Sequence, residues 1–124
     1  MSEQPYVAQL RDQTEFVAGD GCHLRELLHP ERHPVALGYS LAHAYVEAGG
    51  RTADHVLEQS EVYYIIAGRG TMVLDGQAHA VEAGSYYYIP PRCSQWLRND
   101  GEQRLEFLCI VEPPWTAAGE TITE

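Results

Sequence analysis

Short runs of β-branched and aromatic residues recur along most of this chain, and turn-forming residues separate them at intervals of roughly 8–12 positions. No window carries the apolar period of an amphipathic helix. The most informative turn is Asp75-Gly76, between the runs TMVL and QAHAV. A type I′ hairpin turn needs positive φ at both of its central positions, which Asp-Gly tolerates. The sequence therefore predicts an all-β protein, with further turns of the same kind at Gly68-Arg69-Gly70 and Asn99-Asp100-Gly101.

The strand pattern divides the chain of 124 residues into one domain and two peripheral segments. Residues 1–21 are polar and are expected to form an N-terminal segment that supplies an edge strand, in place or swapped to a neighbouring subunit. Pro113-Pro114 removes backbone donors and ends the last strand, so residues 22–115 form the domain and 116–124 a tail. The predicted strands are 22–29, 36–47, 61–67, 71–74, 77–82, 86–89, 95–98 and 105–112.

The charge of the chain restricts its partners. The 18 acidic and 8 basic residues give a net charge of -10, which repels phosphate backbones and anionic lipid, so neither nucleic acid nor a membrane is expected as a partner. Cys22, Cys93 and Cys109 fit neither a zinc ribbon nor a disulfide framework. No stretch approaches the ~18 apolar residues of a membrane span. We expect a cytoplasmic protein.

Two groups of residues in the middle of the chain have a regular spacing. The first is Gly49, His55, Glu61 and Gly68, with five, five and six residues between them, and the second is Gly84, Pro90 and Asn99, with five and eight. Over residues 36–112 this pattern resembles the two motifs of the cupin family, G-x5-H-x-H-x3-E-x6-G and G-x5-P-x-G-x2-H-x3-N. The resemblance implies a jelly-roll barrel (a double-stranded β-helix), a homodimer, and a metal held by three histidines and a glutamate.

The chain departs from these motifs at three positions. His55 and Glu61 match, but Leu57 stands where the second histidine would be, Gln95 replaces the third, and Arg92 replaces a glycine. Alternation along an extended segment puts Leu57 on the same face as His55, where an alkyl group cannot bind a metal. Gln95 still offers an amide oxygen, which is a weaker ligand. The candidate metal ligands are therefore His55, Glu61 and Gln95.

Two alternatives for the metal stay open. The retained imidazole and carboxylate favour a divalent transition metal (Mn, Fe, Ni or Zn), whereas the lost imidazoles favour weak binding or none. Without a metal, His55 and Glu61 satisfy each other by a hydrogen bond.

Strand alternation also predicts the wall of an internal cavity. Tyr63 shares a face with Glu61, and Phe107 shares one with Cys109 in the last predicted strand. We predict that Tyr63, Phe107 and Cys109 contact a ligand, although aromatic residues in strands also pack cores without any ligand. A mostly apolar cavity with a few polar groups is typical of a small-molecule site.

The sequence thus indicates a small-molecule-binding cupin with two functional alternatives. The first is a metal-dependent isomerase or lyase for a small organic or sugar-like substrate, in which Glu61 or His55 relays a proton. The second is a metal-free ligand-binding or structural module without catalysis. No nucleophile elbow, P-loop or dinucleotide fingerprint is present.

Overall fold

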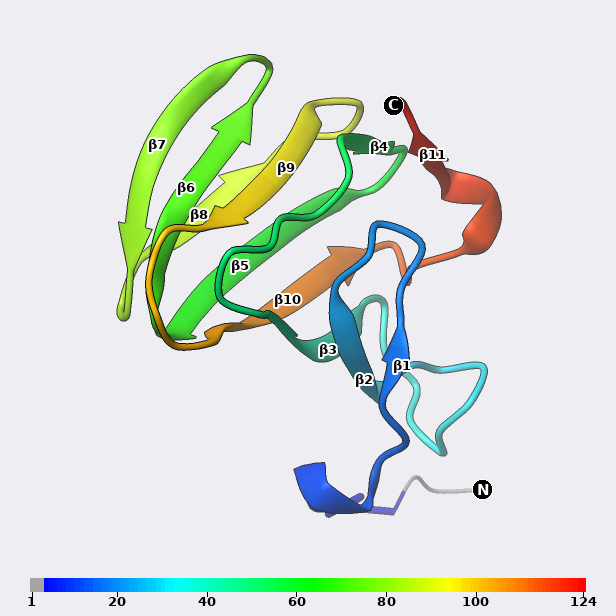
Figure 1. Ribbon diagram of the computed structural model, residues 1–124. Helices are drawn as coiled ribbons and strands as arrows, with labels where there is room; N and C mark the ends of the chain where they lie inside the picture. Colours follow the sequence, from blue (N-terminus) through cyan, green and yellow to red (C-terminus); the bar gives the residue numbers. More distant parts are fainter. Residues whose placement is uncertain (1–3) are drawn as a thin grey trace.

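The computed structural model describes residues 4–124, and nearly all of its regular structure is β (Figure 1). Within this range the helices are two three-residue 3-10 turns, η1 (Leu10–Asp12) and η2 (Ala117–Gly119), so no described helix is long enough to cross a membrane. The strands are β1 (Phe16–Val17), β2 (His23–Leu28), β3 (Ser40–Val46), β4 (His55–Leu57), β5 (Ser60–Ala67), β6 (Arg69–Leu74), β7 (Gln77–Glu82), β8 (Tyr86–Ile89), β9 (Ser94–Asn99), β10 (Leu105–Glu112) and β11 (Glu120–Ile122).

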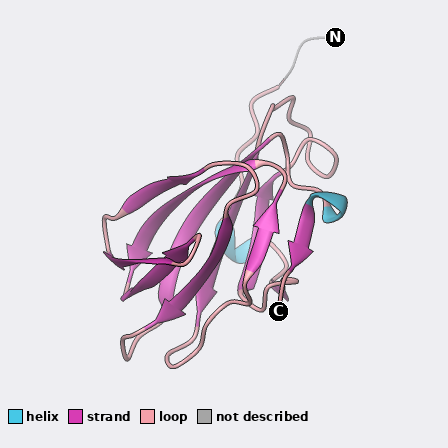
Figure 2. Ribbon diagram, turned by 90° about the horizontal axis from the view of Figure 1, so that it is seen from above, coloured by secondary structure: helices cyan, strands magenta, loops and turns pink. Residues whose placement is uncertain are grey.

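The strands form two antiparallel sheets that lie face to face (Figure 2). One sheet has the order β1-β2-β3-β10-β5-β8 and the other has the order β11-β4-β9-β6-β7. Strands far apart in sequence pair within each sheet, since β10 lies between β3 and β5, and β9 between β4 and β6. Two facing sheets with such connections are a jelly roll. The predicted all-β jelly-roll fold class is confirmed.

All eight predicted strands are present; three have the predicted bounds (77–82, 86–89 and 105–112) and the other five differ at one or both ends. The largest change is at β3, which begins at Ser40 rather than at residue 36 because residues 38–39 form a bend. Strands β4 and β11 were not predicted, and at three residues each they are too short to show alternation in the sequence. Strand β1 pairs with β2 of the same chain at the edge of the larger sheet.

The three predicted turns have different outcomes. Asp75 and Gly76 have φ of 48° and 80°, which confirms the type I′ hairpin between β6 and β7. The prediction of a similar turn at Gly68 was wrong, because Gly68 joins strands of different sheets. The prediction at Asn99 was also wrong, since β9 and β10 lie in different sheets and the Asn99 side chain shapes the connection: it donates to the Val46 carbonyl at 2.9 Å and accepts the Gly101 N–H at 2.9 Å.

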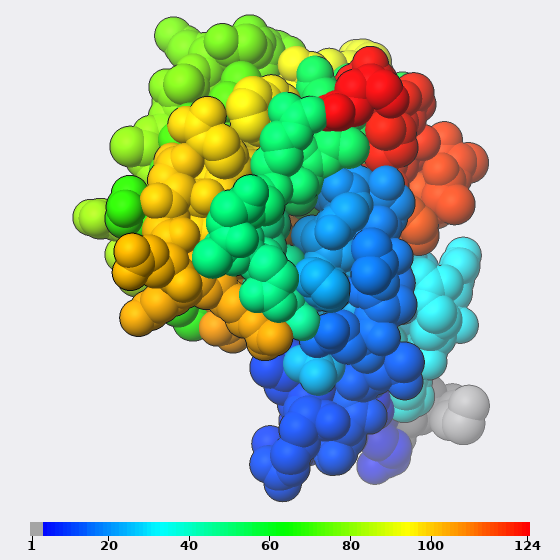
Figure 3. Space-filling model, viewed as in Figure 1, coloured from blue at the N-terminus to red at the C-terminus, as the bar shows by residue number. Residues whose placement is uncertain are grey.

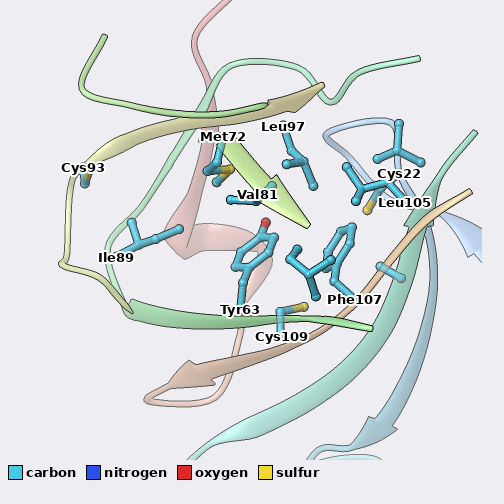
Figure 4. Packing of buried hydrophobic residues seen from close by; sticks show 13 residues of the cluster. Cys22, Tyr63, Met72, Val81, Ile89, Cys93, Leu97, Leu105, Phe107 and Cys109 are labelled. Carbon is cyan, nitrogen blue, oxygen red and sulfur yellow. The ribbon is translucent and has the colours of Figure 1, made fainter. Parts of the chain in front are cut away.

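The core fills the space between the two sheets. Tyr63 and Phe107 point from β5 and β10 toward Met72 and Leu97 of the facing sheet (Figure 4). Alternating residues of β5 and β10 are buried, as period-2 strands with one face inward require. This packing fixes which side chains of β5 face the interior.

Two segments near the ends of the chain, around Asp20 and in β11, lie beside β4 at one end of the barrel. Strand β11 pairs with β4, and its register places Ile122 opposite His55. On the N-terminal side, the Asp20 carbonyl accepts the Ala53 N–H at 2.7 Å just before β4. Figure 3 shows blue N-terminal residues and red C-terminal residues on the same side of the green segment that leads into β4. Asp20 and β11, which belong to the two segments predicted as peripheral, therefore lie beside β4 and His55.

Candidate functional site

A cavity of about 360 Å³ opens at this end of the barrel. Its size is within the range of small-molecule sites, roughly 300–1,000 Å³. Its wall is mostly apolar, with a few ionisable groups. The lining residues that matter for chemistry are Asp20, Glu26, Arg32, His55, Glu61, Tyr63, Phe107, Cys109, Trp115 and Glu120.

His55 begins β4 and is buried, with 2% of its surface exposed. Its Nδ1 lies 2.8 Å from the Ala53 carbonyl, to which it donates, and its Nε2 lies 3.6 Å from the Asp20 Oδ2 atom. Asp20 is oriented in turn by the Cys22 N–H, which its Oδ1 accepts at 3.1 Å. His55 therefore has a fixed ring orientation and an acidic neighbour near its second nitrogen.

Glu61 lies in β5 with its side chain inward and 6% of its surface exposed. Its Oε1 has no hydrogen-bond partner among the described residues. Burial is the main cause that raises the pKa of Glu61 to about 8. Hydrogen bonding to the Gln95 amide lowers this pKa, the negative charges of Asp20 and Glu120 raise it further, and the Cys109 thiol lowers it slightly. At neutral pH Glu61 is therefore largely a protonated acid. The predicted hydrogen bond between His55 and Glu61 is not formed, since His55 faces Asp20 instead.

Gln95 lies on β9 directly opposite His55 in the β4–β9 pairing, and it is 1% exposed. The Tyr63 hydroxyl donates to its Oε1 at 3.3 Å. Its Nε2 has no partner among the described residues. The three candidate metal ligands therefore lie in one region, but the Gln95 oxygen is already used by Tyr63 and Gln95 does not line the cavity.

The three predicted ligand-contacting residues lie together on the cavity wall. The Tyr63 ring stacks on Phe107 with centroids 4.9 Å apart and on Tyr87 at 5.0 Å. Burial and the nearby charges of Glu61 and Asp20 raise the pKa of the Cys109 thiol well above its usual value. Cys109 therefore stays a thiol and acts as a small apolar surface rather than a nucleophile.

Sequence reasoning missed Asp20, Glu120 and Trp115, which come from the two ends of the chain. No spacing rule marks them, because the motifs contain neither end. The sequence offers only an indirect signal for Asp20, which lies between Gly19 and Gly21 in a segment expected to form an edge strand. His43, which shares a predicted strand with several aromatic residues, lies outside the site and pairs with Glu106.

Comparison with known proteins identifies the family. A family model for the cupin domain matches residues 42–111. The chain belongs to the cupin family. This cupin is 38% identical over 110 residues to an uncharacterised protein of Methanocaldococcus jannaschii, with 88% of the chain and 87% of the relative covered.

Solved structures share the fold of this cupin at low sequence identity. A Streptomyces nucleoside dehydratase, of which variants were solved with uridine, aligns with a TM-score of 0.79 at 18% identity, covering 98% of this chain and 92% of that one. The polyketide cyclase RemF from Streptomyces resistomycificus aligns with a TM-score of 0.77 at 19% identity, covering 88% and 80%. At these identities the likeness shows the fold alone.

The residues present do not fit the metal that many cupins hold. Among residues 4–124, no group of three or more His, Cys, Asp or Glu side chains is arranged to bind an ion. Leu57 is 3% exposed and lies one residue beyond Val56 on the face of His55, so an alkyl group occupies the position of a second imidazole. Glu61 would have to lose its proton, and Gln95 its bond to Tyr63, before either could act as a ligand.

Proposed function

We propose that this cupin binds a small organic molecule in the cavity and removes water from it, or closes a ring in it, by acid–base chemistry without a metal. The observation that carries the proposal is the Glu61 carboxyl group, which is buried in the wall of the cavity that His55 and Asp20 also line, and whose Oε1 has no hydrogen-bond partner among residues 4–124. A protonated carboxyl group and an oriented imidazole that face one cavity are the usual partners of general acid–base catalysis. The dehydratase and cyclase with the same fold agree with this class of reaction.

The reaction needs one proton donor and one proton acceptor. The protonated Glu61 donates to the oxygen of a substrate hydroxyl group as the C–O bond breaks, so that the hydroxyl leaves as water. His55 takes the proton from the adjacent carbon at Nε2, and the C–H electron pair forms the new double bond. Asp20 stabilises the imidazolium, and proton exchange with solvent returns both groups to their starting states. An isomerase would use the same two groups for a proton shift.

The test is an activity screen on metal-depleted protein. Small hydroxylated compounds are incubated with chelator-treated wild type, and loss of water is followed by mass spectrometry. We expect Glu61→Gln to lower the rate by at least ~100-fold, the lower range for a lost general acid, without abolishing ligand binding. Turnover that appears only when a divalent metal is added, or that survives in Glu61→Gln, would contradict the proposal.

A metal-free binding module is the second candidate. The stacked rings of Tyr63 and Phe107 and the predominantly apolar wall favour it, because such surfaces bind without any chemistry. In that case compounds bind to wild type and Glu61→Gln alike and are recovered unchanged from both.

We also propose that a second copy of the chain covers the outer face of the larger sheet. Exposed apolar residues adjoin one another there: Val62, Tyr64, Ile66, Tyr86, Tyr88 and Ile110. These six side chains are uncharged, so they can pack against a second copy without burying a charge of their own. Sedimentation should give a dimer that Tyr64→Glu dissociates and Val7→Glu, at an exposed position elsewhere, leaves intact. A monomeric wild type at micromolar concentration would refute this.

A further inference from the structure

The cavity wall has an excess of acidic groups. Four carboxyl groups line it, from Asp20, Glu26, Glu61 and Glu120, against one guanidinium, that of Arg32. Arg32 is already neutralised, since its Nη2 donates to Glu26 Oε2 at 2.8 Å and its Nε contacts the other oxygen of the same carboxylate. Three acidic groups therefore remain without a described arginine beside them in the cavity.

Asp20 and Glu120 lie close to His55, and Glu61 lines the same cavity. Asp20 Oδ2 lies 3.6 Å from His55 Nε2, and Glu120 lies against the same segment, where a Cβ on Gly19 would be only 3.1 Å from Glu120 Oε1. His55 is the one group in this cluster that can carry positive charge.

A second, independent observation indicates that something is missing from the cluster. Glu61 has 6% of its surface exposed and lines the cavity, and its buried Oε1 atom has no hydrogen-bond partner in residues 4–124. A buried acceptor left without a partner is unfavourable, and a ligand N–H can supply the missing hydrogen bond. Tyr63 and Phe107, whose rings stack on each other, line the same cavity and supply apolar wall beside it.

We propose that the natural ligand carries a protonated amine, which binds among Asp20, Glu61 and Glu120 and donates to the Glu61 carboxyl group, while its apolar part lies against Tyr63 and Phe107. This inference rests on the proposed function of the cavity and names the class of molecule it accepts. An anionic ligand is disfavoured because it would meet the carboxylates of Asp20 and Glu120, while the arginine of the cavity wall is already paired with Glu26. A neutral alcohol can bond to Glu61 but gains nothing from the charges of the other two.

Three probes of nearly equal size separate these cases: benzylamine, benzyl alcohol and benzoate. Their affinities are measured by ligand-observed NMR and calorimetry at pH 7.5 and low salt, with the full-length protein. We expect benzylamine to bind at least tenfold more tightly than benzyl alcohol, and benzoate to bind most weakly. The preference should shrink as salt is added, since part of it is Coulombic.

Variants assign the preference to the cluster. In Asp20→Asn and Glu120→Gln, benzylamine should lose at least fivefold in affinity while benzyl alcohol changes by less than twofold, and circular dichroism checks the fold of each. Glu112→Gln, on the exposed side of β10, removes one negative charge outside the cavity and should leave both affinities unchanged.

The outcomes distinguish the two proposals. If benzyl alcohol or benzoate binds as tightly as benzylamine, the amine inference is wrong and the cavity remains a small-molecule site. If none of the three probes binds at millimolar concentration, both the inference and the proposed function are refuted. If Glu112→Gln weakens benzylamine as much as Glu120→Gln does, the preference comes from the net charge of the chain rather than from this cluster.

Discussion

The buried acid at position 61 should make the stability of this cupin depend on pH in a particular direction. Burial raises the pKa of Glu61 from an ordinary value of 4.5 to about 8. In the unfolded chain the group ionises near pH 4.5, whereas in the folded protein it keeps its proton until about pH 8. Between these two values the unfolded state is favoured more and more as the pH rises, because it alone has released the proton.

The size of the effect follows from the two pKa values. Each pH unit between them changes the free energy of unfolding by 1.36 kcal/mol, so the contribution of Glu61 falls by about 5 kcal/mol from pH 4.5 to pH 8 and is constant above and below. Glu61→Gln keeps the shape of the side chain but cannot ionise. Relative to wild type, the variant should therefore gain stability steadily across this window.

Equilibrium urea unfolding, followed by circular dichroism at half-unit steps from pH 4.5 to pH 9, measures this difference. Glu58→Gln, at an exposed position in the β4–β5 turn, controls for the loss of one negative charge. Wild type and Glu61→Gln profiles that run parallel from pH 4.5 to pH 8 would show that Glu61 ionises in the folded protein as it does in the unfolded chain. The general-acid role would then lose its basis.

In urea unfolding, Gly68→Ala should destabilise the protein by about 3 kcal/mol and Gly84→Ala by about 1 kcal/mol. Both glycines have positive φ (88° and 93°), but only at Gly68 would the new Cβ meet backbone atoms, the nearest at 2.5 Å. Equal losses of stability in the two variants would contradict this reasoning. Tyr63→Phe should cost about 1 kcal/mol of stability by the same measurement, since it removes the bond to Gln95, and no loss would mean that this bond contributes nothing. Combining Leu57→His with Gln95→His should create a stoichiometric zinc site, measured by elemental analysis, whereas untagged wild type should carry far less than one ion per chain; a fully loaded wild type would refute the reasoning on donors.

The strands with strong alternation could be predicted from the sequence, and so could the inward faces of β5 and β10. Period-2 burial in Glu61–Tyr63 and in Phe107–Cys109 follows from one sheet face packing on the other. The Asp75-Gly76 hairpin could also be predicted, because its backbone angles depend on those two residues alone. The turns at Gly68 and Asn99 could not, since each one links strands of different sheets, and a glycine does not indicate whether the next strand pairs with the previous one or crosses to the facing sheet.

The candidate site was predictable only in part, for a similar reason. The spacing of His55 and Glu61 places them correctly on their strands, but a hydrogen bond between them could not be judged without knowing what else reaches His55. Asp20 and Glu120 reach it from opposite ends of the chain, through β-pairing and a single backbone contact. Short strands such as β11 have no periodic signature, so the groups that they position cannot be located from sequence pattern.

The departures at Leu57 and Gln95 account for the chemistry of Glu61. In a cupin that has all its metal ligands, a dication beside the carboxylate at the position of Glu61 would keep that carboxylate ionised, because a nearby opposite charge lowers the pKa of an acid. Here an alkyl group and a neutral amide stand at two ligand positions, and Asp20 and Glu120 add negative charge rather than removing it. Burial then dominates, so the carboxyl group changes from a metal ligand into an acid that holds its own proton. Without a dication, the negative charges of Asp20 and Glu120 are not neutralised, and a cationic ligand can neutralise them in its place.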